Sequence, residues 1–340
     1  MAKSVKLSDI ATKLGVSTVT VSKALSDQKG VSDEVRSKIK KLASEMGYIS
    51  PSAARIQLER RSYNIGVLVS SKYFDQTQSF YWLMYQELAT KALNKNCFTM
   101  LEVVQEEEEE GGVVPKLLEG NRINGLVVIG VMKDSYIKSI ERNARVPVIY
   151  MDFYNKEQNS DSVVSDNYFG MYQMTDYLCE LGHKKIAYVG TLFATNSITD
   201  RYFGYCKALY EHGIPIRKDY VIDDRAIDTG AMKPELQYSF PHDMPTAFVC
   251  NCDVTALKLI SDLEERGYRV PEDISVVGYD DYAFQNNGEI ELTTYAVDVK
   301  EMARKTLKIL LRKMNGEYFN KGVTVVPGRM VIRSTAASVK

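Results

Sequence analysis

Short apolar runs alternate with amphipathic segments over most of this 340-residue chain. Six runs rich in β-branched residues predict buried strands, at 65–70, 125–130, 147–152, 185–190, 247–251 and 274–280. Segments with helical spacing lie between them, at 79–95, 167–181, 199–213, 253–267 and 299–315. Because continuous apolar strands that alternate with helices are typical of parallel sheets covered on both faces, residues 62–340 are predicted to be α/β.

The first 61 residues differ from the rest in both pattern and charge. They hold 12 Lys+Arg and 6 Asp+Glu, a net charge of +6, whereas the remainder has −7 and the whole chain −1. A basic segment joined to an acidic one indicates a nucleic-acid partner for the basic part. The total charge alone would have hidden this asymmetry.

Three short amphipathic segments follow one another in this basic part. The first spans about 7–14 and is broken by Gly15, and Ser17 is a good N-cap for a second over about 18–26. A third should start after Ser32 and end at Gly47. Two short helices joined by a glycine-containing turn and backed by a third predict a helix-turn-helix, the alternative being a small bundle with a solvated surface.

Several classes of function are disfavoured by what the chain contains. No apolar run approaches transmembrane length and the first residues lack a signal-peptide pattern, so we expect a cytoplasmic protein without a membrane partner. Five cysteines suggest reduced thiols, and three histidines without ligand spacing suggest no metal. With no dinucleotide or P-loop motif, we expect no cofactor. The run Glu106–Glu110 is expected to be a solvated loop that opens a helix and has no partner.

The stretch "KLSDIATKLGVSTVTVSKALSDQKGVSDEVRSKIKKLASEMGYI" resembles the DNA-binding domain of the lac repressor (LacI/GalR) family almost end to end. Its most specific part is "GVSTVTVSKAL". The resemblance implies that the second helix contacts DNA, with base contacts mainly by Thr18, Val19 and Lys23 and phosphate contacts mainly by Ser17, Thr20 and Ser22. A lysine can reach the O6/N7 edge of guanine, and a methyl-bearing side chain can pack on thymine.

Residues 50–61 correspond to the hinge of that family, where a helix inserts a leucine into the minor groove. Counting back from Ile65, the inserted position falls on Gln57, so either the register slips and Leu58 inserts, or the insertion is weaker than usual. Ile56 and Leu58 lie beside it. Ala54 is one of the small or apolar residues of this expected helix, and Arg55 adds positive charge where DNA would lie. A plain linker is the alternative.

The rest of the chain resembles the family's two-lobed, periplasmic-binding-protein-like sensor. The resembling stretches are 165–190, 200–209, 269–281, 292–311 and 331–336. The implied organisation is a DNA-binding domain at 1–49, the hinge at 50–61 and an effector domain at 62–340. One lobe would hold about 62–163 plus 296–324 and the other about 164–294 plus 326–340, with the ligand between them.

The resemblance also implies effector-binding positions. Arg201 in "TDRYFGY" matches an arginine that holds sugar hydroxyls, and Asp280 in "VGYDD" is a carboxylate at a strand end. Phe80 and Tyr81 could stack on a sugar face. The alternatives are an interlobe salt bridge for Arg201 and Asp280, and core packing for Phe80 and Tyr81.

Two departures from the family pattern bear on the ligand. The usual "A-N-D" reads Asn251-Cys252-Asp253, which keeps Asp253 in the predicted site but replaces an amide by a thiol. Arg225 stands where many members have an aromatic residue, so one hypothesis is an effector with a carboxylate or phosphate.

The sequence therefore predicts a transcription regulator, most simply a repressor, that is not an enzyme. It would act as a homodimer on a palindromic double-stranded operator, under control of a small sugar-like effector. Two other classes are a solute-binding protein for transport, which the basic segment opposes, and a sugar-processing enzyme, which no nucleophile–base motif supports.

Overall fold

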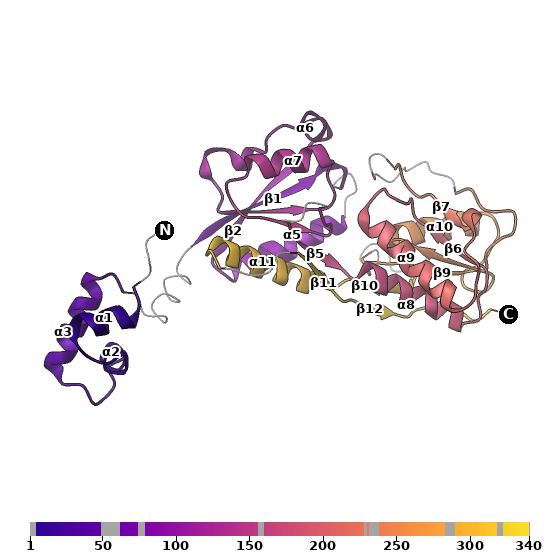
Figure 1. Ribbon diagram of the computed structural model, residues 1–340. Helices are drawn as coiled ribbons and strands as arrows, with labels where there is room; N and C mark the ends of the chain where they lie inside the picture. Colours follow the sequence, from indigo (N-terminus) through magenta and orange to yellow (C-terminus); the bar gives the residue numbers. More distant parts are fainter. Residues whose placement is uncertain are drawn as a thin grey trace. The chain divides into compact units, whose positions relative to one another are not determined.

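The computed structural model describes residues 5–48, 62–73, 79–155, 160–227, 230, 238–282, 290–317 and 322–339. The chain forms two compact units, Met1–Ser62 and Tyr63–Lys340 (Figure 1). The hinge predicted at 50–61, with Ala54, Arg55, Gln57 and Leu58, lies outside the described residues. No helix among the described residues is long and apolar enough to cross a membrane.

The first unit is the predicted helix-turn-helix. Its helices are α1 (Leu7–Leu14), α2 (Thr18–Leu25) and α3 (Asp33–Glu45). Gly15 ends α1 with φ of 65°, a left-handed conformation that glycine adopts without strain. The three helices enclose a small core of Ile10, Ala11, Val21, Ala24, Ile39 and Ala43.

The second unit begins with a six-stranded parallel sheet in the order β11-β5-β4-β3-β1-β2. We call this sheet, together with the helices that cover it, lobe 1. Its strands are β1 (Tyr63–Ser70), β2 (Cys97–Val104), β3 (Gly125–Ile129), β4 (Val148–Met151), β5 (Asp161–Ser165) and β11 (Val323–Val326). Helices α5 (Phe80–Leu93) and α11 (Val299–Met314) pack on one face. The other face is covered by α7 (Asp134–Asn143) and the 3-10 helix η2 (Lys116–Asn121).

Lobe 2 is a smaller parallel sheet in the order β7-β6-β8-β9. Its strands are β6 (Ile186–Val189), β7 (Val221–Ile222), β8 (Ala247–Cys250) and β9 (Ser275–Val277). Helices α8 (Asn167–Glu180) and α9 (Asn196–Glu211) cover one face, and α10 (Asp253–Glu265) covers the other. The helices α8 and α9 touch at Gly204, where a Cβ atom would clash with the Tyr168 carbonyl oxygen.

The chain passes between the lobes more than once. It enters lobe 2 through α8 after β5 and returns to lobe 1 through α11 after β10 (Thr294–Ala296). After β11 it runs back, and β12 (Arg329–Val331) pairs antiparallel with β10. This confirms the predicted fold class, a helix-turn-helix followed by a two-lobed α/β domain.

The expectation of a solvated loop at the glutamate run is wrong. The run forms the short helix α6 (Glu106–Gly111), and Glu109 is buried at 2% exposure. Glu109 accepts hydrogen bonds from the Ser70 hydroxyl at 2.8 Å and from the Lys133 backbone N–H at 2.6 Å. The burial follows from the helical period, which turns one glutamate inward while Glu106 and Glu107 stay exposed.

Candidate functional site

The polar residues of the second unit gather where strands of both lobes end. Asp152 directly follows β4 in lobe 1, and Asp280 closely follows β9 in lobe 2. Arg201 comes from α9, and Arg225 follows β7. The carboxyl ends of parallel strands are the usual position of binding sites in open α/β sheets.

Arg201 is buried among partners from three segments. Its Nε donates to Asn167 Oδ1 at 2.8 Å, and its Nη2 lies 3.5 Å from Asp280 Oδ1. The guanidinium also lies 3.8 Å from the centre of the Tyr279 ring. Since Arg201 and Asp280 both belong to lobe 2, their ion pair lies within one lobe rather than between the two.

Asp152 and Asp280 are buried carboxylates with unused acceptor capacity. In each, Oδ1 makes no hydrogen bond to a residue that the structure describes. Burial raises the pKa of Asp152 to about 6, opposed by the nearby Arg201, and it raises the pKa of Asp280 for the same reason. Both residues have positive φ, 68° and 115°. The region therefore holds two buried carboxylate oxygens that can accept further hydrogen bonds.

Sequence reasoning overlooked Asp152. It ends the strand run at 147–152 much as Asp280 ends the run at 274–280, and this parallel was the available signal.

The predicted aromatic pair is divided between two roles. Tyr81 stacks on Tyr73 with ring centroids 4.1 Å apart, next to Gly130, where a Cβ atom would meet both rings. Phe80 packs partly against the core of lobe 1 and makes an edge contact with Tyr282 of lobe 2 at 5.7 Å. Tyr81 therefore packs within lobe 1, whereas Phe80 also contacts lobe 2.

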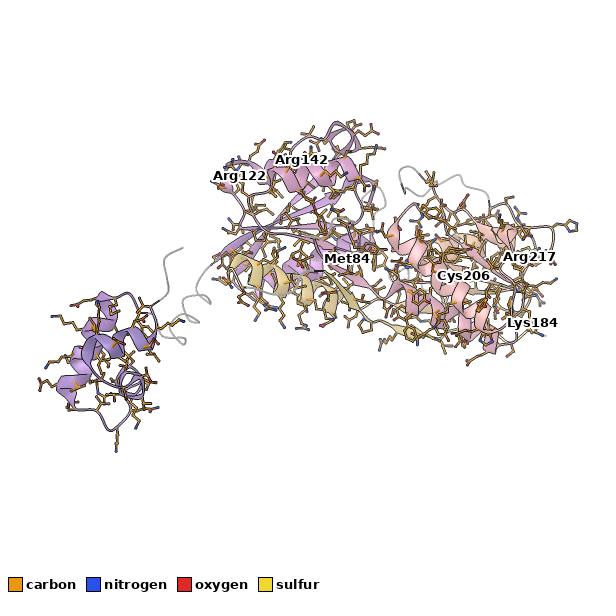
Figure 2. All side chains as sticks on the ribbon, viewed as in Figure 1. Met84, Arg122, Arg142, Lys184, Cys206 and Arg217 are labelled. Carbon is orange, nitrogen blue, oxygen red and sulfur yellow. The ribbon has the colours of Figure 1, made fainter. Side chains whose placement is uncertain are left out.

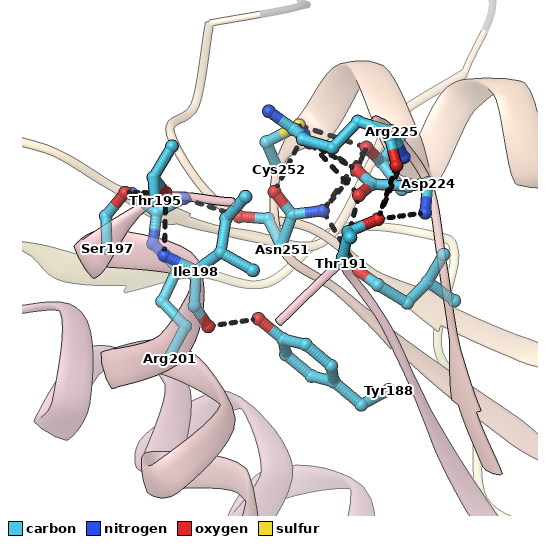
Figure 3. Close-up of polar contacts among 12 residues, drawn as sticks. Tyr188, Thr191, Thr195, Ser197, Ile198, Arg201, Asp224, Arg225, Asn251 and Cys252 are labelled. Carbon is cyan, nitrogen blue, oxygen red and sulfur yellow. Dashed lines mark hydrogen bonds and ion pairs between the residues drawn. The ribbon is translucent and has the colours of Figure 1, made fainter. Parts of the chain in front are cut away.

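Arg225 is bound within lobe 2 by Asp224 (Figure 3). Its Nε lies 3.0 Å from Asp224 Oδ1 and its Nη2 lies 2.7 Å from Oδ2, and Nη2 also donates to Asn251 Oδ1 at 3.0 Å. Burial alone would raise the pKa of Asp224, but Arg225 and the Thr255 hydroxyl lower it to about 2. An anionic ligand would thus have to compete with Asp224 for this guanidinium.

Asp253 and Cys252 lie at the start of α10. Asp253 is buried, and its carboxylate accepts from the Tyr282 N–H at 2.9 Å and from the Thr294 hydroxyl at 2.5 Å. Cys252 Sγ lies 3.2 Å from Thr255 Oγ1 and accepts from Arg225 Nη2 at 3.6 Å. These contacts hold the segments after β9 and around β10 against α10. No group of metal ligands was found among the described residues.

Two side chains of α9 form hydrogen bonds with Tyr154 and connect the lobes beside this region. The Tyr154 hydroxyl lies 3.2 Å from both carboxylate oxygens of Asp200, and Asn196 Nδ2 donates to the Tyr154 carbonyl at 3.2 Å. Tyr154 belongs to lobe 1, whereas Asn196 and Asp200 belong to α9.

Glu109 ties together two loops of lobe 1 at the same edge, those after β1 and β3. The Tyr73 hydroxyl donates to the Val131 carbonyl at 2.8 Å, so the two loops are also joined directly. Glu109→Ala would leave the Ser70 hydroxyl and the Lys133 N–H without their acceptor. We expect the free energy of unfolding to fall by about 2–3 kcal/mol, with faster amide exchange in 70–73 and 130–133.

The matched control is Glu107→Ala, an exposed residue of the same helix that carries the same charge. It should change the stability by less than about 0.5 kcal/mol. Urea unfolding and hydrogen exchange of the three proteins make the comparison, and equal behaviour of the two variants would contradict the assigned role of Glu109.

In the first unit, α2 presents a polar face to solvent. Thr18, Val19, Ser22 and Lys23 are exposed, whereas Val21 and Ala24 are fully buried. Ser17 caps the helix, accepting from the Thr20 N–H at 3.1 Å, and the two hydroxyls lie 2.9 Å apart. Val19 is 61% exposed, although nothing in the unit requires an apolar side chain there.

Arg36 of α3 fixes the end of this helix and the loop that follows it. It donates to the carbonyls of Ala24, Gln28 and Val31 and pairs with Asp27. Sequence reasoning did not single out Arg36, since an arginine on an amphipathic helix is usually solvated.

Fold and site together define a helix-turn-helix protein with a two-lobed, periplasmic-binding-protein-like domain. Two family models match it: bacterial regulatory proteins of the lacI family over residues 6–51, and a periplasmic binding protein-like domain over residues 175–336. The HTH-type transcriptional repressor PurR of Vibrio vulnificus is 27% identical, covering 98% of this chain and 99% of its own. The repressor CytR of Escherichia coli K12 is also 27% identical, covering 98% and 96%.

Solved structures have the same fold. A complex of the transcriptional regulator CelR with cellobiose has a TM-score of 0.68 at 22% identity, covering 98% of this chain and 100% of its own. The lac repressor dimer bound to operator and the anti-inducer ONPF has a TM-score of 0.66 at 24% identity, with the same coverage. Along almost its whole length the chain is thus similar to transcriptional repressors, and its first domain matches the lacI family of bacterial regulatory proteins. These relatives are DNA-binding repressors and not enzymes.

Proposed function

We propose that the protein is a repressor that binds a palindromic operator as a homodimer. A neutral, hydroxyl-rich sugar that binds between the lobes would lower or raise its affinity for this operator. The observation that carries the proposal is the exposed face of α2. Its side chains are short except for Lys23, so the helix can approach base edges closely.

The similarity to the repressors PurR and CytR supports the DNA-binding part. The hydroxyls of Ser17, Thr20 and Ser22 would bind phosphates, while Thr18, Val19 and Lys23 would read bases. The exposure of Val19 has a reason in this proposal, because a thymine methyl would cover it.

The effector part rests on the unused acceptors. Asp152 and Asp280 would accept hydrogen bonds from sugar hydroxyl groups, and Arg201 would orient these two carboxylates. Tyr81 and Phe80 would flank the sugar ring. Asp253 would act by holding the neighbouring segments. Because Asp224 neutralises Arg225, a neutral effector suits the site better than an acidic one.

The homodimer part is supported by apolar residues exposed on lobe 1. Phe98 and Met100 project from the edge strand β2, and Trp82 and Leu93 are exposed on α5. A second copy of the chain could bury the exposed apolar side chains of such an edge strand. Two copies would present two α2 helices to the half-sites of one operator.

Selection of binding sequences from random duplexes is the experiment that tests this function. We expect a near-palindrome, with an affinity that falls steeply as salt increases. Lys23→Ala should relax the preference at one base pair per half-site by about 1–3 kcal/mol.

Lys38→Ala is the matched control, because it removes the same charge from an exposed position on α3. It should weaken all duplexes alike or not at all. Recovery of no preferred sequence by the parent protein would refute the proposal, and uniform loss in Lys23→Ala would make Lys23 a phosphate contact.

A further inference from the structure

The amino-terminal edge of the lobe 1 sheet is basic, although residues 62–340 carry a net charge of −7. Arg122, Arg142 and Arg145 are exposed there, and they form no ion pair with a residue that the structure describes. Arg122 follows η2, while Arg142 and Arg145 lie at and after the end of α7. Figure 2 shows Arg122 and Arg142 on lobe 1, away from the labelled residues of lobe 2.

Arg145 lines a groove between η2 and the end of α7, and Arg122 and Arg142 are next in the chain to its lining residues Asn121 and Asn143. The groove has a volume of about 350 Å³, and its polar lining consists of Asn121, Asn143 and Arg145. Apolar side chains such as Leu118 and Val146 form its floor. Amide and guanidinium donors around a shallow groove are groups that bind phosphate oxygens.

The opposing charges at this edge are already largely paired. Asp161 is bound by Lys313 at 2.6 Å, and Glu317 is bound by Arg312 at 2.9 Å. Glu119 is exposed, and its single negative charge offsets only one of the three arginines. The edge therefore keeps a positive surplus.

The chain joins lobe 1 at this same edge. β1 begins there at Tyr63, and the Asn64 side chain donates to the Arg122 carbonyl at 3.2 Å. Residues 49–61, which connect it to the helix-turn-helix, can span at most about 45 Å even when fully extended. The chain therefore links the helix-turn-helix to lobe 1 at its basic edge.

We propose that Arg122, Arg142 and Arg145, with the amides of Asn121 and Asn143, form a second DNA-binding surface that contacts backbone phosphates without reading sequence. The inference rests on the proposed operator binding. In this role the surface adds affinity for any duplex long enough to reach it, and the acidic remainder of the domain repels DNA from other faces.

The test is a full-length variant with all three arginines replaced by alanine, titrated with the selected operator and with a random duplex of equal length. Each lost phosphate contact lowers the slope of log affinity against log salt by about 0.9, so we expect a decrease of about 2–3 for each protomer on the DNA and about 5 for the dimer. Both duplexes should lose affinity by the same factor, leaving the ratio between them unchanged. The control replaces Lys184, Lys218 and Arg269 on lobe 2, which are exposed and carry the same charge.

Equal slopes for the parent, the variant and the control would overturn the inference. So would a thermal shift by inorganic phosphate that the variant loses while its DNA slope stays unchanged, because the groove would then bind small anions. If the parent itself fails to distinguish operator from random duplex, the proposed function fails, which is a separate result. The folded state of each variant is checked by its unfolding temperature.

Discussion

Arg201→Met is expected to lower the free energy of unfolding of the effector domain by about 3–5 kcal/mol near neutral pH, and to abolish the response of operator binding to any sugar. Arg201 lies 3.5 Å from the buried carboxylate of Asp280, and its charge opposes the rise in the pKa of the buried Asp152. Removing one partner of a buried ionic cluster leaves the other charges without compensation. Methionine keeps much of the volume, so the loss reports charge rather than a cavity.

The pH dependence distinguishes this cause from general damage. A carboxyl group whose folded pKa lies above its unfolded value costs stability as it ionises, from about pH 4 to about pH 6 for Asp152. Without Arg201 that cost increases, so the deficit should be largest at pH about 8 and smaller at pH about 5. The double variant Arg201→Met/Asp280→Asn should recover part of the stability at pH about 8. A deficit independent of pH, measured by urea unfolding, would contradict the argument.

Asp224→Asn is expected to cost about 3–5 kcal/mol of stability, because Arg225 would remain as a largely buried cation without its counter-charge. The carboxylate also accepts from Thr191 N, Asn251 Nδ2 and Thr255 Oγ1, at 2.9, 2.6 and 2.7 Å. Because the pKa of Asp224 is lowered to about 2, its contribution is full above about pH 4 and is lost as pH falls towards 2. That acid-side dependence should be reduced in the variant.

The same substitution tests the choice between neutral and acidic effectors. With Asp224 neutral, the Arg225 guanidinium becomes available to an anion, so glucuronate should gain at least about tenfold in affinity relative to glucose. The double variant Asp224→Asn/Arg225→Met should lose that gain and recover stability. Thermal shifts with this matched pair of sugars provide the measurement. A parent protein that already prefers glucuronate would support the hypothesis of an acidic effector instead.

The secondary structure could be predicted where apolar residues follow a single period. The three helices of the first unit, and the strands β1, β3, β4, β6, β8 and β9, are found at or near the predicted positions. The edge strand β2 was missed because only its ends are fully buried, so its run mixes polar and apolar residues. β7 and β12 have only two and three residues, too few for a pattern to show.

The site was harder to predict, because its partners come from distant segments. Arg201 and Asp280 could be named from the family resemblance. Asp152 had only its place at the end of a strand run as a signal, and its proximity to Arg201 of the other lobe follows from tertiary structure alone. Asp224 stands next to Arg225 in the chain, yet adjacency alone does not show that the two side chains pair. Glu109 cannot be told from its four neighbours until α6 packs against lobe 1.

The amino-acid sequence by itself determined the helix-turn-helix, the α/β class and the division into a basic and an acidic part, because each depends on local periodicity or on counted charge. Tertiary structure alone decided which charges are compensated. It pairs Arg225 with Asp224, leaves acceptors free on Asp152 and Asp280, and exposes Arg122, Arg142 and Arg145 at the edge where the chain enters lobe 1. The reason is physical: the effect of a charge depends on its burial and its nearest counter-charge, and both are set by residues far away in the chain.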